Sequence, residues 1–238
     1  MKGVILAGGK GTRLRPMTDV VNKHVLPVYD EPIIFYPVRT LLGSGIDDIM
    51  VVSTPESIGR YIQILENEFD ADFRYRVQKE PKGIADALML ADDFVDDTVA
   101  VMLGDNIVFD DLSPAVEEFR SDDSAAKVFL KRVNEPSRYG IAEIDDGIVG
   151  LTEKPENPES DHAIIGIYLY DRSVFDVIPT LEPSDRGEYE ITDVNEVYLR
   201  RDELDYEIVE SEWFDVGTPE GIFRASEFVR ERRRGEHS

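Results

Sequence analysis

The feature that most constrains the fold is a short apolar strand that runs directly into a glycine-rich loop at the start of the chain. Residues 4–7 read VILA and residues 8–18 read GGKGTRLRPMT. Glycine has no side chain to block a close approach, so backbone N–H groups in such a loop can surround a phosphate. Arg13, Arg15 and Lys23 add positive charge nearby. The pattern predicts an α/β protein with this loop beyond a buried strand, and it indicates an enzyme that handles a nucleoside triphosphate.

The spacing of the glycines disagrees with two common phosphate-binding templates. A Walker A loop needs Lys and then Ser or Thr directly after its second glycine. Gly3 and Gly8 have the required separation, but Gly9 stands where the lysine should be. In the dinucleotide fingerprint GxGxxG, Gly9 and Gly11 would need a third glycine where the chain has Leu14. These spacings argue against a GTPase, a kinase of the Walker type and an NAD-binding enzyme.

Strand-like and helix-like segments alternate through the first half of the chain. In the helix predicted over 55–65, Ile58, Tyr61 and Leu65 recur on one face, and Thr54 is the expected cap. Alternation of this kind predicts crossover connections and a mostly parallel sheet with helices on both faces. The other predicted segments are strands at 3–7, 48–52, 73–77 and 98–103, and helices at 84–91 and from Ser113 onward.

The second half changes to short β-like segments with turn signals such as Asp145-Asp146-Gly147. They predict either antiparallel strands added to the same sheet or a small separate lobe. The strands are expected at 125–132, 139–144, 147–152 and 163–170, with a strand-like stretch at 206–214. Helices are expected near 172–178, 191–200 and 219–232.

Charge and composition narrow the class of partner. The chain carries 50 acidic and 26 basic residues, for a net charge of −24, so it should repel nucleic acid. It contains no cysteine, which fits a reducing cytoplasmic environment, and no secretory leader or membrane span is expected from its apolar runs. The acidic excess is either an ordinary solvated surface or a halophilic adaptation, because molar salt screens charges beyond about 3 Å.

A series of short motifs runs in order along almost the whole chain. After LAGGKGTRLRPMT and NKHVLPVYD come VQKEPKGIADA (77–87), LGDN (103–106), RYG (138–140), EKP (153–155), RGEYEITD (186–193) and WFDVGT (213–218). Together they resemble the signature of the sugar-1-phosphate nucleotidylyltransferases, and within that family its thymidylyltransferases. The resemblance implies a Rossmann-like three-layer nucleotidyltransferase fold in one domain, 1–238, with a nucleotide-binding part at about 1–122 and a sugar-phosphate-binding part at about 123–238.

The resemblance also implies a reaction. A phosphate oxygen of glucose 1-phosphate would attack the α-phosphorus of dTTP in line, with Mg²⁺ as cofactor, to give dTDP-glucose and pyrophosphate. The product would serve deoxysugar or surface-polysaccharide synthesis, and the protein would be a homo-oligomer, a dimer or a tetramer. Two alternatives stay open, namely a uridylyltransferase that uses UTP and a non-catalytic regulatory subunit that binds a nucleotide sugar.

The family motifs assign roles to residues on the nucleotide side. Arg13, Lys23 and Asp105 would be catalytic, because a planar guanidinium and a compact ammonium can hold phosphates. Asp105 and Asp215 would bind the metal. Gln78 carries a donor and an acceptor, which suits the edge of a thymine or uracil. The expected nucleotide-binding residues are Leu6, Ala7, Gly8, Gly9, Gly11, Thr12, Arg13, Gln78, Gly83 and Asp105.

On the sugar-phosphate side the resemblance assigns Tyr139, Gly140, Glu153, Lys154 and Arg186. His24 is expected to be a packing or phosphate neighbour. The chain departs from the family in two places. Ile165 precedes Gly166 where the thymidylyltransferases commonly have threonine, which bears on the sugar. The chain also ends soon after the 219–232 helix, so a regulatory nucleotide site built on a C-terminal extension is not expected.

Overall fold

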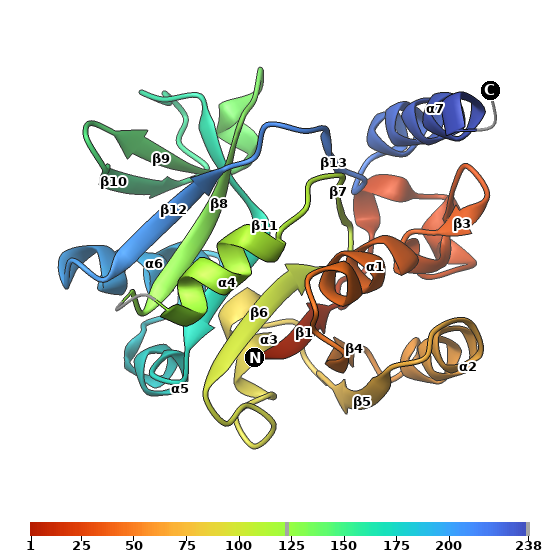
Figure 1. Ribbon diagram of the computed structural model, residues 1–238, viewed down its shortest axis with the longest axis horizontal. Helices are drawn as coiled ribbons and strands as arrows, with labels where there is room; N and C mark the ends of the chain where they lie inside the picture. The colour runs from red at the N-terminus through yellow and green to blue at the C-terminus, as the bar shows by residue number, and fades with distance from the viewer. Residues whose placement is uncertain (122–123, 237–238) are drawn as a thin grey trace.

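The computed structural model describes residues 1–121 and 124–236. At its centre lies a nine-stranded sheet in the order β10-β9-β11-β6-β1-β4-β5, in which β8 pairs with β11 and β12 pairs with β8 (Figure 1). The four strands predicted for the first half are present as β1 (Lys2–Leu6), β4 (Asp48–Ser53), β5 (Asp72–Val77) and β6 (Thr98–Leu103). They are all parallel, as the alternating pattern predicted, and the structure places them in the order β6-β1-β4-β5.

The β-like segments of the second half join the same sheet. They form β8 (Ala126–Arg132), β9 (Gly140–Ile144), β10 (Ile148–Glu153) and β11 (His162–Asp171). The long strand β11 runs antiparallel to β6, β8 and β9, and it thereby connects the added strands to the parallel part. The sequence left open whether these segments add antiparallel strands to the sheet or form a small separate lobe, and the structure shows that they add antiparallel strands. The strand β12 (Leu204–Ile208) extends this side of the sheet parallel to β8.

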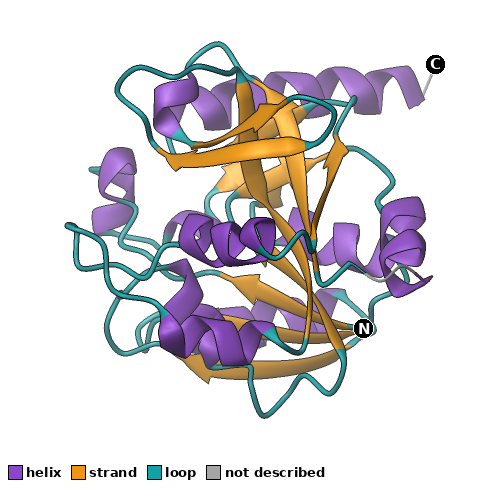
Figure 2. Ribbon diagram, turned by 90° about the vertical axis from the view of Figure 1, so that its left-hand side faces the viewer, coloured by secondary structure: helices purple, strands orange, loops and turns teal. Residues whose placement is uncertain are grey.

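Helices cover both faces of the sheet, which completes the predicted three-layer α/β arrangement (Figure 2). One face packs against α3 (Ile84–Met89), α5 (Val174–Val177) and α6 (Ile191–Arg200). The other packs against α1 (Phe35–Gly43), α2 (Ile58–Glu68) and α4 (Ser113–Ser121). Short 3₁₀ turns in the described chain lie at Thr12–Leu14, Met17–Asp19, Lys23–Val25, Pro136–Arg138 and Ile178–Thr180.

Some local predictions were wrong. Helix α2 begins at Ile58, because residues 54–57 form a turn in which the Thr54 carbonyl accepts from the N–H groups of Ser57 and Ile58, so Thr54 is not its cap. Helix α1 was not predicted from the sequence. The strand-like stretch 206–214 is divided, because β12 ends at Ile208 and a separate strand, β13 (Trp213–Asp215), pairs elsewhere.

A small layer beside the main sheet joins distant segments. In it β13 pairs with β7 (Asn106–Val108), β2 (Pro27–Val28) pairs with β3 (Glu31–Pro32), and α7 (Pro219–Glu236) packs over them. Its own apolar cluster includes Leu14, Leu26, Phe214 and Val229. This layer places the Lys23 motif next to β13. Among the described helices, none has the length and apolar character needed to cross a bilayer.

Candidate active site

The glycine-rich loop leaves the carboxyl end of β1, between the ends of β4 and β6. Ala7 is buried, and its N–H donates to Val52 O at 2.8 Å. Gly11 has φ of 59°, and a Cβ there would lie 2.8 Å from Cγ2 of Thr18. The loop therefore needs glycine at this point, both for its backbone conformation and for its packing. Thr12 then begins a 3₁₀ turn that carries Arg13.

Lys23 and Asp105 form a largely buried ion pair at this edge of the sheet. The Lys23 Nζ lies 2.5 Å from Oδ2 of Asp105, and the two side chains are 14% and 12% exposed. Asp105 follows β6, at the carboxyl ends of the parallel strands where ligands bind in such sheets. Burial alone would raise the pKa of Asp105, but the adjacent Lys23 charge holds that pKa well below its usual value. The carboxylate is therefore ionised at neutral pH.

His24 lies directly behind this ion pair and is completely buried. Its Nδ1 lies 2.9 Å from Oδ1 of Asn22 and 3.0 Å from the Tyr61 hydroxyl. Burial, and then the Lys23 charge, lower the pKa of His24 to about 3, so the ring is neutral. A Cβ on Gly104 would lie 2.9 Å from Cδ2 of the ring. The imidazole therefore packs against the turn that presents Asp105, as the packing alternative for His24 predicted.

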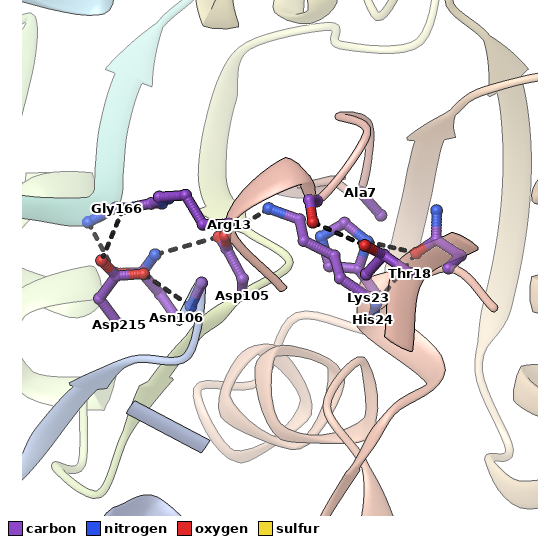
Figure 3. Close-up of polar contacts among 12 residues, drawn as sticks. Ala7, Arg13, Thr18, Lys23, His24, Asp105, Asn106, Gly166 and Asp215 are labelled. Carbon is purple, nitrogen blue, oxygen red and sulfur yellow. Dashed lines mark hydrogen bonds and ion pairs between the residues drawn. The ribbon is translucent and has the colours of Figure 1, made fainter. Parts of the chain in front are cut away.

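Asp215 lies beside Asp105 because β13 pairs with β7, with the N–H of Val216 donating to Asp105 O at 3.0 Å. Figure 3 shows Asp105 between Lys23 on one side and Asp215 on the other. The Oδ2 of Asp215 is 3.9 Å from Nη1 of Arg13 and 3.4 Å from Nη2 of Arg138. Arg138 belongs to the motif RYG, but no role was predicted for it from the sequence. Its place directly before Tyr139 was the available signal.

The donor set at this point fits a hard divalent cation such as Mg²⁺. Asp105, directly before β7, and Asp215, at the end of the neighbouring β13, offer carboxylate oxygens, and the charge of each is balanced by basic side chains. Within residues 1–121 and 124–236, no three His, Asp or Glu side chains gather in a group that could hold a metal. Mg²⁺ commonly takes one or two carboxylates and completes its shell with waters and substrate phosphates. Two carboxylates beside the glycine-rich loop match that preference.

Gln78 lies at the end of β5, between the glycine-rich loop and α3. Its Nε2 donates to Oδ2 of Asp86 at 2.8 Å, and its Oε1 faces Gly8, where a Cβ would be 3.4 Å away. Gly83, just before α3, has φ of 105°, and a Cβ there would lie 2.4 Å from the Tyr189 carbonyl oxygen. The approach is this close because Tyr189 N–H donates to Lys82 O at 2.8 Å. The 82–85 segment is thus attached to the RGEYEITD segment.

A second polar cluster surrounds Glu153 at the end of β10. Its carboxylate accepts from the Thr192 hydroxyl at 2.7 Å, Lys154 Nζ at 2.6 Å and Arg186 Nη2 at 3.1 Å. Burial would raise the pKa of Glu153, but the hydrogen bonds from Lys154 and Thr192 lower it. A Cβ on Gly140 would lie 2.9 Å from Oγ1 of Thr192. The structure therefore brings the predicted Gly140, Glu153, Lys154 and Arg186 together and adds Thr192, which was missed although its motif was quoted.

Tyr139 connects the two clusters. Its ring meets Trp213 edge to face at 5.4 Å, and its carbonyl accepts from Lys154 N at 3.0 Å. Ile165, at the position where the thymidylyltransferases commonly have threonine, lies outside both clusters. Ile165 is buried in the apolar cluster that contains Ile167, whereas Ile164 belongs to the other cluster and lies 3.7 Å from a Cβ placed on Gly140. The side chain at 165 therefore packs in the core rather than against Gly140.

Comparisons with known proteins agree on the family. A model of the family described as nucleotidyl transferase matches residues 2–232. A glucose-1-phosphate thymidylyltransferase of Mycolicibacterium smegmatis is 43% identical over 238 residues, covering 97% of this chain and 82% of the relative. The enzyme of the same name from Mycobacterium tuberculosis is 40% identical over 245 residues, covering 99% of this chain and 85% of the relative.

Solved structures agree as well. A crystal structure from Bacillus anthracis, provisionally described as a glucose-1-phosphate thymidylyltransferase in complex with sucrose, matches with a TM-score of 0.92 and 47% identity, covering 97% of this chain and 95% of that one. A UDP-glucose pyrophosphorylase complexed with UDP-glucose matches with a TM-score of 0.83 over 97% of this chain and 98% of that one. At 24% identity, the second match supports the fold alone.

Proposed function

We propose that this chain, which belongs to the nucleotidyl transferase family, forms dTDP-glucose and pyrophosphate from dTTP and glucose 1-phosphate. The relatives reported above are named for this activity, glucose-1-phosphate thymidylyltransferase. The observation that carries the proposal is that Asp105 and Asp215 lie beside each other at the glycine-rich loop, Asp105 against Lys23 and Asp215 against Arg13 and Arg138. One anionic substrate could be held there, and the second set of basic side chains, Lys154 and Arg186 at Glu153, could hold the other.

The first part of the chain, about 1–122, would bind the nucleotide. The loop from Leu6 to Thr12 would surround the triphosphate with its N–H groups, and Arg13 would hold the outer phosphates. Lys23 would exchange its bond to Asp105 for one to the reacting phosphate. The Gln78 Oε1, which faces Gly8, would accept from the N3–H of thymine or uracil, whereas cytosine has no hydrogen at N3. Gly83 would let the backbone approach the base.

Asp105 and Asp215 would hold Mg²⁺. The ion would offset the charge that develops on the α-phosphate and on the leaving pyrophosphate. For the protein, the consequence is that Asp105 must stay ionised inside the fold, and the Lys23 charge beside it favours that state. The neutral His24 adds no competing positive charge there.

The second part, about 123–238, would bind the sugar phosphate. Glu153 would accept hydrogen bonds from sugar hydroxyls, Tyr139 and Gly140 would line the sugar, and Lys154 with Arg186 would hold the phosphate. Lys154 is held at φ of 44°, a conformation uncommon for residues other than glycine, and its Nζ donates to Oε1 of Glu153 at 2.6 Å. The attacking oxygen would then be aligned with the α-phosphorus, so that positioning supplies much of the rate enhancement.

The experiment that tests this function is pyrophosphate release by the purified chain with Mg²⁺. It crosses dTTP, UTP, CTP, GTP and ATP with the 1-phosphates of glucose, galactose, mannose and N-acetylglucosamine. Release that is greatest with dTTP and glucose 1-phosphate supports the proposal. A preference for UTP would make the enzyme a uridylyltransferase. Absence of release from every pair, in a folded chain that binds nucleotide, would favour a regulatory subunit instead.

Several finer proposals follow from the same function. The enzyme would act in the cytoplasm as a homo-oligomer, which the mass of the chain in solution tests, and its product would enter deoxysugar or surface-polysaccharide synthesis. With a net charge of −24, it would also be adapted to high salt. A thermal midpoint that is equal in dilute buffer and in molar KCl would contradict the salt adaptation.

A further inference from the structure

Asn106, which directly follows Asp105, connects three strands through one side chain. It is only 5% exposed. Its Oδ1 accepts from the backbone N–H of Gly166 at 3.1 Å and from the indole Nε1 of Trp213 at 2.8 Å. Its Nδ2 lies 3.4 Å from Oδ1 of Asp105. The amide thus joins β7 to β11 and β13, and it touches the carboxylate that the proposed reaction depends on.

The contacts of Asn106 close a ring around the site. Trp213 meets Tyr139 edge to face at 5.4 Å, and the Arg138 guanidinium lies 5.4 Å from the centre of the Tyr139 ring. Arg138 in turn reaches Asp215 at 3.4 Å, and Asp215 is the register partner of Asn106 across β7 and β13. The ring therefore runs from the two carboxylates proposed to hold the metal to Tyr139, which is proposed to line the sugar, and back.

The chemistry of the position selects asparagine. Two donors converge on Oδ1, so an apolar replacement would leave the Gly166 and Trp213 N–H groups without an acceptor in a buried place. Aspartate would still accept both hydrogen bonds, but it would put a second carboxylate next to Asp105 and raise the cost of ionising that residue. There is also little room to shift, since a Cβ on Gly166 would lie 2.8 Å from Nδ2 of Asn106.

We propose that Asn106 is a positioning residue that holds the sugar wall, Tyr139 with Trp213, in alignment with Asp105 and Asp215. The proposal rests on the function proposed above. Loosening this alignment affects the sugar phosphate more than the nucleotide, because the glycine-rich loop and Gln78 lie outside the ring of contacts and Arg13 meets it at Asp215, away from Tyr139 and Trp213.

The test compares Asn106→Leu and Trp213→Phe with the unchanged protein in pyrophosphate release, varying glucose 1-phosphate and dTTP separately. We expect Asn106→Leu to lower kcat/KM for glucose 1-phosphate about 10- to 100-fold, since misplacements near 1 Å have effects of this size, with KM for dTTP changed far less. Trp213→Phe keeps an aromatic edge for Tyr139 and removes one of the two N–H donors, so it should cause a smaller change of the same kind. Their double variant should lose less than the product of the two single losses, because both act through one contact.

Trp213 also gives a readout that needs no turnover, since it is the only tryptophan of the chain. Glucose 1-phosphate added to the unchanged protein should alter its fluorescence, and Asn106→Leu should shift the emission and require more sugar phosphate for the same change. Asn67→Leu is the matched control, because Asn67 bonds only to Gln63 O on the surface of α2 among the described contacts. Equal losses on both substrates, or additive losses in the double variant, would overturn the positioning role.

The two failures are distinguishable. An unchanged protein that releases no pyrophosphate from any pair would overturn the proposed function, and this inference with it. An active unchanged protein whose Asn106→Leu and Trp213→Phe variants keep the same kcat/KM for glucose 1-phosphate would overturn the inference alone. If Asn106→Leu does not fold, Trp213→Phe decides by the same criterion.

Discussion

The two charged clusters of the site differ in how they are held. The Lys23–Asp105 pair has side chains that are 14% and 12% exposed, and it is backed by the buried His24. Around Glu153, Lys154 and Arg186 are 44% and 45% exposed, and Glu153 has three donors. Water therefore screens the second cluster, and its contacts are partly redundant. The first cluster is neither screened by water nor redundant in its contacts, so substitution of each of its groups should reduce activity more.

The difference follows from the sheet. Asp105 lies at the carboxyl ends of parallel strands that are buried on both faces, where the chain can present few polar groups. Glu153 ends β10, the edge strand of the antiparallel part, where solvent reaches the side chains. The position of a charged group in the sheet, more than its charge, should thus determine how much activity is lost when the group is substituted.

The largest effect is expected for Asp105→Asn, which removes the proposed metal ligand and leaves Lys23 with a neutral partner. Turnover should fall by about 10³-fold or more, because electrostatic groups at the reacting centre have effects of this order. Steady-state kcat and circular dichroism measure the loss and the integrity of the fold. Asp93→Asn, at an exposed carboxylate paired with Arg76, is the control and should stay near the unchanged value. Near-normal turnover in Asp105→Asn would remove the distinction between the two clusters.

The next effect concerns the contact that joins the two parts. Gly83→Ala would force a Cβ to 2.4 Å from the Tyr189 oxygen at φ of 105°. Unfolding free energy should fall by about 2–5 kcal/mol from strain and overpacking together. The control is Gly45→Ala, at φ of 71° with open space around it, which should cost about 1 kcal/mol from the backbone alone. Denaturant unfolding gives both values, and equal losses would mean that the 83–189 contact adds nothing.

A smaller effect is expected in the exposed cluster. Arg186→Ala should raise KM for glucose 1-phosphate about 10-fold and leave KM for dTTP nearly unchanged, since one charged hydrogen bond is lost on one substrate. Initial rates with each substrate varied in turn measure the two constants. Arg200→Ala is the control, because Arg200 pairs with Glu196 on the surface of α6. An equal rise for both substrates would reassign Arg186.

The smallest expected effect is a difference between the two clusters in how salt changes the defect of each variant. Raising KCl from 0.1 to 2 M should reduce the Arg186→Ala defect about threefold and leave the Asp105→Asn defect unchanged, because salt screens exposed charges far more than buried ones. The ratio of kcat/KM for variant and unchanged protein at each salt concentration measures this. If both defects shrink equally, the difference in burial does not control the function of the two clusters.

Much of the architecture was predictable because it depends on local patterns. The parallel strands are short apolar runs bounded by turn residues, and α6 has the bounds predicted from the sequence, Ile191 and Arg200. Helix α1 was not predicted, because prolines and an apolar, β-like run lie just before it and at its start. Phe35, Val38 and Leu41 nevertheless share its buried face. The site motifs indicated which segments matter, but Arg138, Thr192 and Asn106 were not singled out, since each acts through partners distant in the chain.

By itself, the sequence determined most of the helices and strands of the main sheet, the glycine-rich character of the loop and the chemical types of the candidate site residues. These follow from interactions within a few residues, such as apolar periodicity and the freedom of glycine to adopt positive φ. Only the tertiary structure decided that Lys23 pairs with Asp105, that Asp215 lies beside them and that Asn106 joins Gly166 to Trp213. These contacting residues are 60 to 110 positions apart, so strand order and register, set by the whole hydrogen-bonded sheet and its packed helices, bring them together.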